Sequence, residues 1–279
     1  MDSIVKIGKS IIQHGKYNDR IYLMKLDHGD LPSLLDEIDA LAEQKCYSKI
    51  FTKVPGAFRK LFYEHNYLCE VVIQQYYGKD DALFMSKFLS DARSVTTHNE
   101  IHEDVLKTAL SKEEEEELSS LSPEYTIRIC DRNDVEKMAD VYRKIFKTYP
   151  FPIQDPNYLL KVMEENIVFF GVFNEDEPLA LSSAEMDIEN SGVEMTDFAT
   201  LPEFRGNGFS SHLLAYMNKE MRKHGIRTAY TIARAKSYGM NSVFAKSGYI
   251  YCGMLVNNTN ISGNIESMNV WSKKLEIDN

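Results

Sequence analysis

The sequence predicts an α/β protein of the α+β type, with a mixed central sheet flanked by helices and a smaller α/β half-domain in front of it. Three observations carry this prediction. Strand-like and helix-like segments alternate through residues 124–279, a glycine turn at 205–210 joins one strand to one helix, and the first part of the chain repeats segments of the last.

The second part of the chain shows the clearest alternation. Runs rich in β-branched and aromatic residues predict strands, and apolar residues at helical spacing predict helices. The predicted strands are residues 125–130, 167–173, 179–186, 193–200, 228–233, 249–256 and 266–272. The predicted helices are residues 134–146, 157–163, 211–224 and 237–246.

An acidic run separates the two parts of the chain. Residues 113–117 are five consecutive glutamates, which repel one another and favour a solvated linker or an exposed helix. Serines and Pro123 follow this run. We therefore predict an N-terminal half-domain at residues 1–95, an acidic linker at 96–123 and the main domain at 124–279.

The half-domain resembles the end of the main domain. Residues 62–67 align with 244–249, and residues 84–89 align with 270–275. Upstream, a predicted strand and helix correspond to the strand and helix on either side of the glycine turn. The loop between them has no arginine and no second glycine. The pattern predicts half of the same fold without its anion site, although so short a match also allows coincidence.

Composition limits the classes of function. A net charge of −10 and a pI of about 5.3 argue against nucleic acid or an anionic membrane as partner. The start has no signal-peptide pattern, no apolar run approaches a membrane span, and the four cysteines are widely separated, which together predict a cytoplasmic protein with reduced thiols. His98 and His102 have helical metal-ligand spacing but no third ligand nearby, so we predict a solvated helix there and no metal.

The glycine turn itself predicts a phosphate site. Glycines let the backbone approach a ligand closely, and the free N–H groups and dipole of the following helix favour negative charge. An ordinary strand-to-helix turn is the alternative for so short a pattern.

The element order and this turn resemble the GNAT N-acetyltransferase family. The family signature is Gln or Arg, any two residues, Gly, any residue, and Gly or Ala. Arg205, Gly208 and Ser210 match it with one departure, the serine. The whole chain resembles the narrower group of β-lysine N-acetyltransferases, which make the compatible solute Nε-acetyl-β-lysine, at residues 239–244, 257–259, 261–263 and 266–271.

This resemblance implies acetyl-CoA as co-substrate and a small-molecule amine, β-lysine, as acceptor. The pantetheine arm is expected to pair with the strand at 193–200, and an N–H near Phe198 or Ala199 to bind the acetyl oxygen. The residues implied to bind acetyl-CoA are Phe198, Ala199, Thr200, Arg205, Gly206, Asn207, Gly208, Phe209, Ser210 and Ser211.

The catalytic residues are less clear from the sequence. A lysine-type amine is protonated near neutral pH, so a carboxylate is needed as base, and Glu194 is preferred to Asp197. Asp197 faces the opposite side of a regular strand unless a bulge redirects it. The usual tyrosine acid of the family is replaced by Phe244, which leaves Tyr238 and Tyr249 as candidates.

The acceptor is expected to lie against the loop after the first helix of the main domain and the last hairpin. The candidate residues are Tyr149, Phe151, Asn258, Glu266 and Asn269. Two other functions stay open, namely acetylation of another small amine or a protein lysine, and non-catalytic sensing of acyl-CoA. The half-domain is interpreted as a substrate lid or as the basis of a homodimer.

Overall fold

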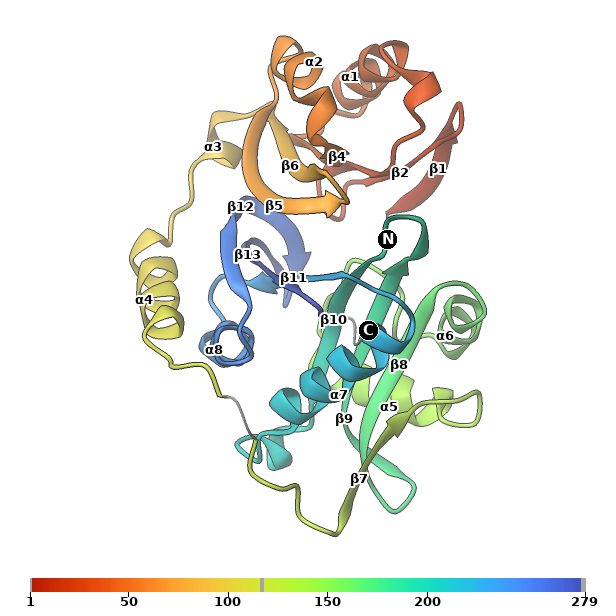
Figure 1. Ribbon diagram of the computed structural model, residues 1–279. Helices are drawn as coiled ribbons and strands as arrows, with labels where there is room; N and C mark the ends of the chain where they lie inside the picture. Colours follow the sequence, from red (N-terminus) through yellow and green to blue (C-terminus); the bar gives the residue numbers. More distant parts are fainter. Residues whose placement is uncertain (1, 116–117, 277–279) are drawn as a thin grey trace. The chain divides into compact units, whose positions relative to one another are not determined.

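The computed structural model describes residues 2–115 and 118–276 (Figure 1). Contacts divide the chain into two compact units. The first unit comprises Met1–Asn99 and Cys252–Met268, and the second comprises Glu100–Tyr251 and Asn269–Asn279. Within the described part of the chain, every helix is too short or too polar to cross a bilayer.

The second unit contains a mixed sheet whose strands follow the order β13-β11-β10-β9-β8-β7. β10 and β11 are parallel, whereas β7 to β10 are antiparallel neighbours. Strand β12 is the other arm of the last hairpin. The bounds are β7 Tyr125–Ile129, β8 Ile167–Asn174, β9 Glu177–Asp187, β10 Gly192–Thr200, β11 Thr228–Arg234, β12 Ile250–Ile261 and β13 Asn264–Lys274.

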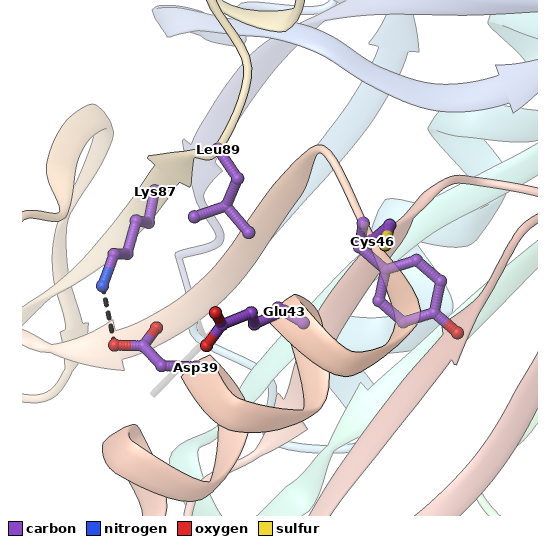
Figure 2. A pocket seen from close by; sticks show the side chains of 7 residues that line it. Asp39, Glu43, Cys46, Lys87 and Leu89 are labelled. Atoms are coloured by element: carbon purple, nitrogen blue, oxygen red, sulfur yellow. Dashed lines mark hydrogen bonds and ion pairs between the residues drawn. The ribbon is translucent and has the colours of Figure 1, made fainter.

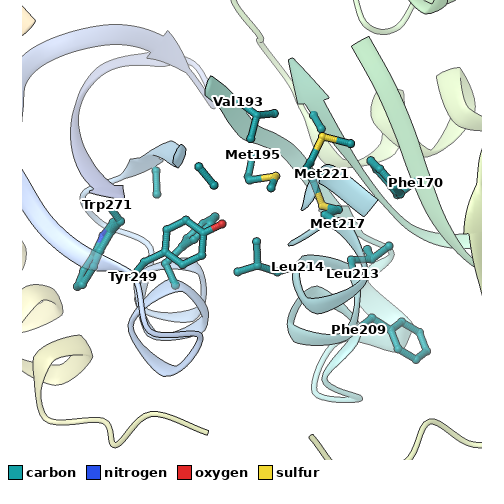
Figure 3. Close-up of a cluster of buried hydrophobic side chains, with 14 of the residues drawn as sticks. Phe170, Val193, Met195, Phe209, Leu213, Leu214, Met217, Met221, Tyr249 and Trp271 are labelled. Carbon is teal, nitrogen blue, oxygen red and sulfur yellow. The ribbon is translucent and has the colours of Figure 1, made fainter. Parts of the chain in front are cut away.

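Helix α7 covers one face of this sheet, and α5 and α6 cover the other (Figure 1). Figure 3 shows Val193 and Met195 of β10 meeting Leu214, Met217 and Met221 of α7 in the buried cluster. The bounds are α4 Asn99–Leu110, α5 Val135–Ile145, α6 Pro156–Met163, α7 Phe209–Lys223 and α8 Tyr238–Lys246, with short 3-10 turns η3 Ile188–Asn190 and η4 Pro202–Phe204.

The first unit has the strand order β1-β2-β3-β4-β6-β5, and Gly253 of β12 pairs with Val71 of β5. Its apolar core lies between the sheet and α1 and α2. The strands are β1 Ser3–Ile7, β2 Ser10–Gly15, β3 Arg20–Lys25, β4 Lys49–Pro55, β5 Leu68–Tyr77 and β6 Asp80–Phe88. The helices are α1 Ser33–Lys45, α2 Arg59–Glu64 and α3 Asp91–Ser94, with 3-10 turns η1 His28–Asp30 and η2 Gly56–Phe58.

The two aligned sequence segments adopt the same local geometry. The rings of Phe62 and Tyr67 pack edge to face at 5.1 Å, and those of Phe244 and Tyr249 also pack edge to face at 5.1 Å. In both segments the tyrosine N–H donates to the phenylalanine carbonyl at 3.0 Å. In both units, too, a parallel strand pair precedes a short helix and a hairpin. These matches support a structural repeat.

The last hairpin is bound within the first unit by three buried cations. Three consecutive carbonyl groups, at residues 256–258, accept hydrogen bonds from Lys49 (2.8 Å), the Nε of Arg93 (2.7 Å) and Arg20 (2.5 Å). Glu70 accepts from Lys49 at 2.9 Å and from the N–H of residue 256 at 2.7 Å. Each backbone group bound in this way favours one position for the middle of β12.

Part of the predicted linker is a packed helix. α4 buries His102, Val105 and Ala109, and Ala109 joins the apolar cluster of the second unit, so the expectation of a fully solvated helix around His98 and His102 was wrong. Glu116 and Glu117 of the acidic run lie outside the described residues. The domain boundaries at 95/96 and 123/124 stay a proposal.

Candidate active site

The glycine turn forms an open loop at the start of α7. Gly206 and Gly208 have φ angles of +90° and +73°, a backbone region that side chains rarely adopt. A Cβ atom at Gly206 would meet nothing within 4 Å, so backbone conformation and not crowding requires this glycine. Gly208 is the N-cap, and no side chain caps α7. The first turn of a 15-residue helix is therefore available to an anion.

The strand before the turn separates from its neighbour. The ladder between β10 and β11 ends at Glu194 and Tyr230, although both strands continue. Among the described residues, the edge of β10 from 195 to 200 therefore has no ladder partner in β11. Phe198 packs edge to face on Phe244 at 5.6 Å, and Ala199 is buried. An extended arm of a ligand has room for backbone pairing only where such an edge is open.

A β-bulge redirects Asp197. The register between β10 and β9 shifts between Thr196 and Ala199, and Asp197 has a φ of +55°. Its buried carboxylate accepts hydrogen bonds from the Ser183 hydroxyl at 2.6 Å and from the Tyr149 hydroxyl. Burial raises the pKa of this carboxyl, and the hydrogen bonds from Ser183, Tyr149 and Thr196 oppose that rise.

Glu194 lies on the same face of the sheet as the redirected Asp197 side chain, but further from the glycine turn. Its carboxylate accepts from the Tyr230 hydroxyl at 2.9 Å, and it stands directly opposite Glu185 in the antiparallel ladder. The Val193 and Met195 side chains on either side of it pack on α7, so alternation directs Glu194 to the face of α5 and α6.

The two tyrosines considered as acids have different surroundings. Tyr249 belongs to the buried cluster in Figure 3. Its ring packs on Phe244, its hydroxyl donates to Asn218 at 2.8 Å, and burial raises its pKa. Tyr238 at the start of α8 is 45% exposed and donates to Asp104, a hydrogen bond that raises its pKa.

The loop between α5 and α6 supplies Tyr149, whose ring packs on Phe146 at 4.6 Å and whose hydroxyl donates to Asp197. Burial and the Asp197 carboxylate raise the pKa of Tyr149 well above its ordinary value. Phe151 lies two residues further along this loop and is half-buried. The structure thus unites Tyr149 with Asp197, two residues 48 positions apart.

The three candidates from the last hairpin are divided between the units. Asn269, in the second unit, donates to the Asn241 side chain at 2.9 Å, and the same Asn241 oxygen accepts from Trp271. The Asn269 side chain therefore has a structural role. Asn258 and Glu266 are buried in the first unit. Their part in acceptor binding stays a proposal.

Sequence reasoning missed four side chains near Asp197 or its partner Tyr149. Ser183 and Glu185 come from β9, Tyr142 comes from α5, and Tyr158 comes from α6. The Asp197 charge raises the pKa of both tyrosines, after burial, which places them near that carboxylate. Period-two alternation in β9 was the available signal, since it puts Ser183 and Glu185 on one face.

A separate hollow of about 380 Å³ lies in the first unit (Figure 2). Asp39 and Glu43 of α1 and Lys87 of β6 point into it, and Lys87 pairs with Asp39 at 2.7 Å. None of the residues predicted for the active site lines this hollow. Over residues 2–115 and 118–276, no group of three or more His, Cys, Asp or Glu is arranged to bind a metal.

Comparison with known proteins places this geometry in a family. The model of the "Acetyltransferase (GNAT) family" matches residues 135–249, which include the bulged strand and the glycine turn. A "Beta-lysine N(6)-acetyltransferase" of Methanococcus maripaludis is 45% identical over 99% of this chain and 100% of its own. "N-acetyltransferase YodP" of Bacillus subtilis is 33% identical over 95% of this chain and 96% of its own.

A second "Beta-lysine N(6)-acetyltransferase", from Methanosarcina mazei, is 30% identical over 88% of this chain and 98% of its own. The similarity therefore extends over both units and is not confined to the acyltransferase region. The chain belongs to the GNAT family and is an N-acetyltransferase that takes its acetyl group from acetyl-CoA.

Proposed function

We propose that the protein acetylates the side-chain amine of β-lysine to give Nε-acetyl-β-lysine, a compatible solute. The acceptor is supported by the two relatives that carry this activity in their names, at 45% and 30% identity over nearly the whole chain. The observation that carries the chemistry is the bulge in β10, which holds the buried Asp197 two residues before Ala199.

The residues around the glycine turn fit an acyl-CoA. We assign its pyrophosphate to the backbone N–H groups of residues 205–211, because this loop is open and α7 has no side-chain cap. Bound acetyl-CoA supplies an activated acetyl group. We assign the N–H of Phe198 or Ala199 to the acetyl oxygen, a donor worth about 3–4 kcal/mol in comparable sites.

The acceptor amine must lose a proton before it attacks. A lysine-type ammonium has a pKa of about 10.4, so almost none is neutral near pH 7. We propose that the ammonium donates to the Tyr149 oxygen while the Tyr149 hydroxyl donates to Asp197. One proton then passes to the carboxylate, whose raised pKa makes it a stronger base than an exposed aspartate.

Distance along β10 favours Asp197 over Glu194 as this base. At about 3.3 Å per residue, Asp197 is about 7 Å from Ala199 and Glu194 about 16 Å from it. A base must lie within hydrogen-bond reach of the amine or one water away from it. Glu194, which the sequence favoured, is therefore assigned a different role below.

The leaving thiolate is a modest base, with an ordinary thiol pKa of about 8.5, so a dedicated acid is not essential. Tyr238 and Tyr249 stay proposed donors, and Tyr238→Phe and Tyr249→Phe test them separately. A homodimer and a cytoplasmic location are also proposals, and the four free cysteines support the cytoplasmic location. Light scattering of the purified protein tests the first, and fractionation of cells tests the second.

The decisive experiment offers acetyl-CoA with β-lysine, α-lysine, spermidine or a lysine peptide and measures released thiol. β-Lysine is expected to have the highest kcat/KM, and NMR of the product should place the acetyl group on the terminal amine. Turnover of the peptide alone would refute the proposal, as would acetylation of β-lysine at its β-amine. Binding of acetyl-CoA without turnover of any amine would favour the sensor.

A further inference from the structure

Two carboxylates face each other on the acceptor side of the sheet. Glu185 of β9 and Glu194 of β10 are directly paired in the antiparallel ladder, and both are partly exposed. Directly opposite residues have their Cβ atoms about 5 Å apart, and like charges in that position are unfavourable. Two carboxylates at this spacing can both accept hydrogen bonds from one ammonium group placed between them.

The pair shares a face with the bulged Asp197. Ser183, two residues before Glu185, donates to Asp197, so alternation along β9 puts Ser183 and Glu185 on that face. The charges of Glu185 and Asp197 both raise the pKa of Tyr149 and of Tyr158, after burial. The loop tyrosine, the bulge and the carboxylate pair therefore border one region of the second unit.

The spacing along β10 matches a diamine. Glu194 and Asp197 are three residues apart, about 10 Å along the strand and somewhat less with the bulge. The two nitrogens of an extended 3,6-diamino acid are separated by five bonds, about 6 Å, and a hydrogen bond adds about 3 Å at each end. A diamine of this length reaches from the Tyr149–Asp197 pair to the carboxylate pair.

An independent sign of a missing polar partner lies at Tyr142. This side chain is fully buried on α5, which contacts β9 and β10. After burial, the Asp197 charge raises the pKa of Tyr142. Its hydroxyl has no hydrogen-bond partner among the described residues. A buried hydroxyl without a partner costs about 1–3 kcal/mol, and such a cost is typical of functional sites.

We infer that Glu185 and Glu194 form the subsite for the second ammonium of the acceptor and so select diamino acids over monoamines. This inference rests on the proposed function, because it assigns the non-reacting amine of the same substrate. The terminal amine then meets Tyr149 and Asp197, and the β-ammonium meets the carboxylate pair. Glu194 is thereby a specificity residue and not the base.

The test compares β-lysine with 6-aminohexanoate, which has the same reacting amine and carboxylate but no β-amine. We expect the native enzyme to favour β-lysine in kcat/KM by about 10- to 1000-fold. In Glu185→Gln, Glu194→Gln and the double variant, KM for β-lysine should rise about 10- to 100-fold with kcat nearly retained, and the preference should shrink towards unity. KM for acetyl-CoA should not change.

Glu189→Gln is the matched control, because Glu189 is an exposed carboxylate on the short turn between the same two strands. An equal loss of kcat on both substrates in Glu194→Gln would overturn the inference and restore Glu194 as the base. An unchanged preference in the double variant would also overturn it. Failure of the native enzyme on every amine would instead refute the proposed function, so the two failures are distinguishable.

Discussion

At the scale of single residues, the behaviour of Asp197 depends on one backbone irregularity. A regular strand would turn this side chain towards α7 and the apolar cluster, where a carboxylate has no partner. The left-handed φ at Asp197 redirects it to the hydroxyls of Ser183 and Tyr149. Strain of this kind costs about 1–3 kcal/mol and is typical of functional sites.

Asp197→Asn should reduce kcat for β-lysine by about 10²- to 10⁴-fold, because the amide accepts no proton. KM for acetyl-CoA should stay within about twofold, since the glycine turn is untouched. Steady-state thiol release checks both values, with Glu189→Gln as the control. A variant that keeps more than half of the native kcat would exclude Asp197 as the base.

The pKa shift of Asp197 also predicts how stability depends on pH. Its folded pKa is raised by burial, so its contribution is fully present below the unfolded value of about 3.9 and is lost as pH rises through the folded value. At pH 7 the ionised carboxylate therefore lowers stability relative to a neutral amide. Thermal unfolding should show Asp197→Asn to be more stable than the native protein at pH 7, and this gain should shrink towards pH 4.

At the scale of elements, the start of α7 offers a controlled test of the anion site. Gly206 and Gly225, which follows the end of the same helix, have left-handed φ angles of +90° and +73°, and a Cβ atom at either meets nothing within 4 Å. Alanine should therefore strain both turns by a similar amount, about 1–2 kcal/mol. Only Gly206→Ala alters the surface offered to the pyrophosphate.

Gly206→Ala should raise KM for acetyl-CoA by about tenfold or more, whereas Gly225→Ala should leave it within about twofold. Titration with desulfo-CoA, followed by calorimetry, should give the same ratio for binding alone. Equal affinities in the two variants would remove the glycine turn from the binding site.

The buried cations of the first unit make a second prediction at this scale. Lys49 is fully buried, and burial lowers its pKa to about 8. Lys49→Met leaves the Glu70 charge buried and unpaired, which should cost about 3–5 kcal/mol in urea unfolding. Lys49→Met combined with Glu70→Gln should recover part of this loss, whereas Lys60→Met, which breaks the exposed pair with Glu64, should cost less than about 1 kcal/mol.

At the scale of the whole molecule, the chain does not divide at a single point. Residues 252–268 of the last hairpin are counted with the N-terminal unit, and their carbonyls at 256–258 accept from Lys49, Arg93 and Arg20. A separate acyltransferase domain at 124–279 would contain these carbonyls without their donors and would also lack Ala109 of α4.

A chain that begins at residue 124 should therefore unfold at least about 10 °C below the full chain, because several buried polar groups lose their partners. Circular dichroism during heating measures this difference, and a chain that begins at residue 96 separates the effect of α4 from that of the first unit. An unchanged midpoint in the shorter chain would show that the acyltransferase domain is independent.

The sequence alone determined the alternation of strands and helices, the glycine turn, the apolar stripe of α7 and the family. These features are local: periodicity fixes which face of a helix is apolar, and only glycine takes φ angles such as those at 206 and 208 without strain. The match between residues 62–67 and 244–249 is also local, because it depends only on adjacent residues. A segment of six residues was therefore enough to indicate the repeat.

Only the tertiary structure decided what surrounds the reacting amine. The pairing of Asp197 with Tyr149 and of the hairpin carbonyls with Lys49 joins residues that are distant in the chain. Strand alternation set Asp197 on the wrong face because a bulge adds one residue to one strand, and its position depends on the register with β9. Such contacts depend on packing between elements, which no local pattern encodes.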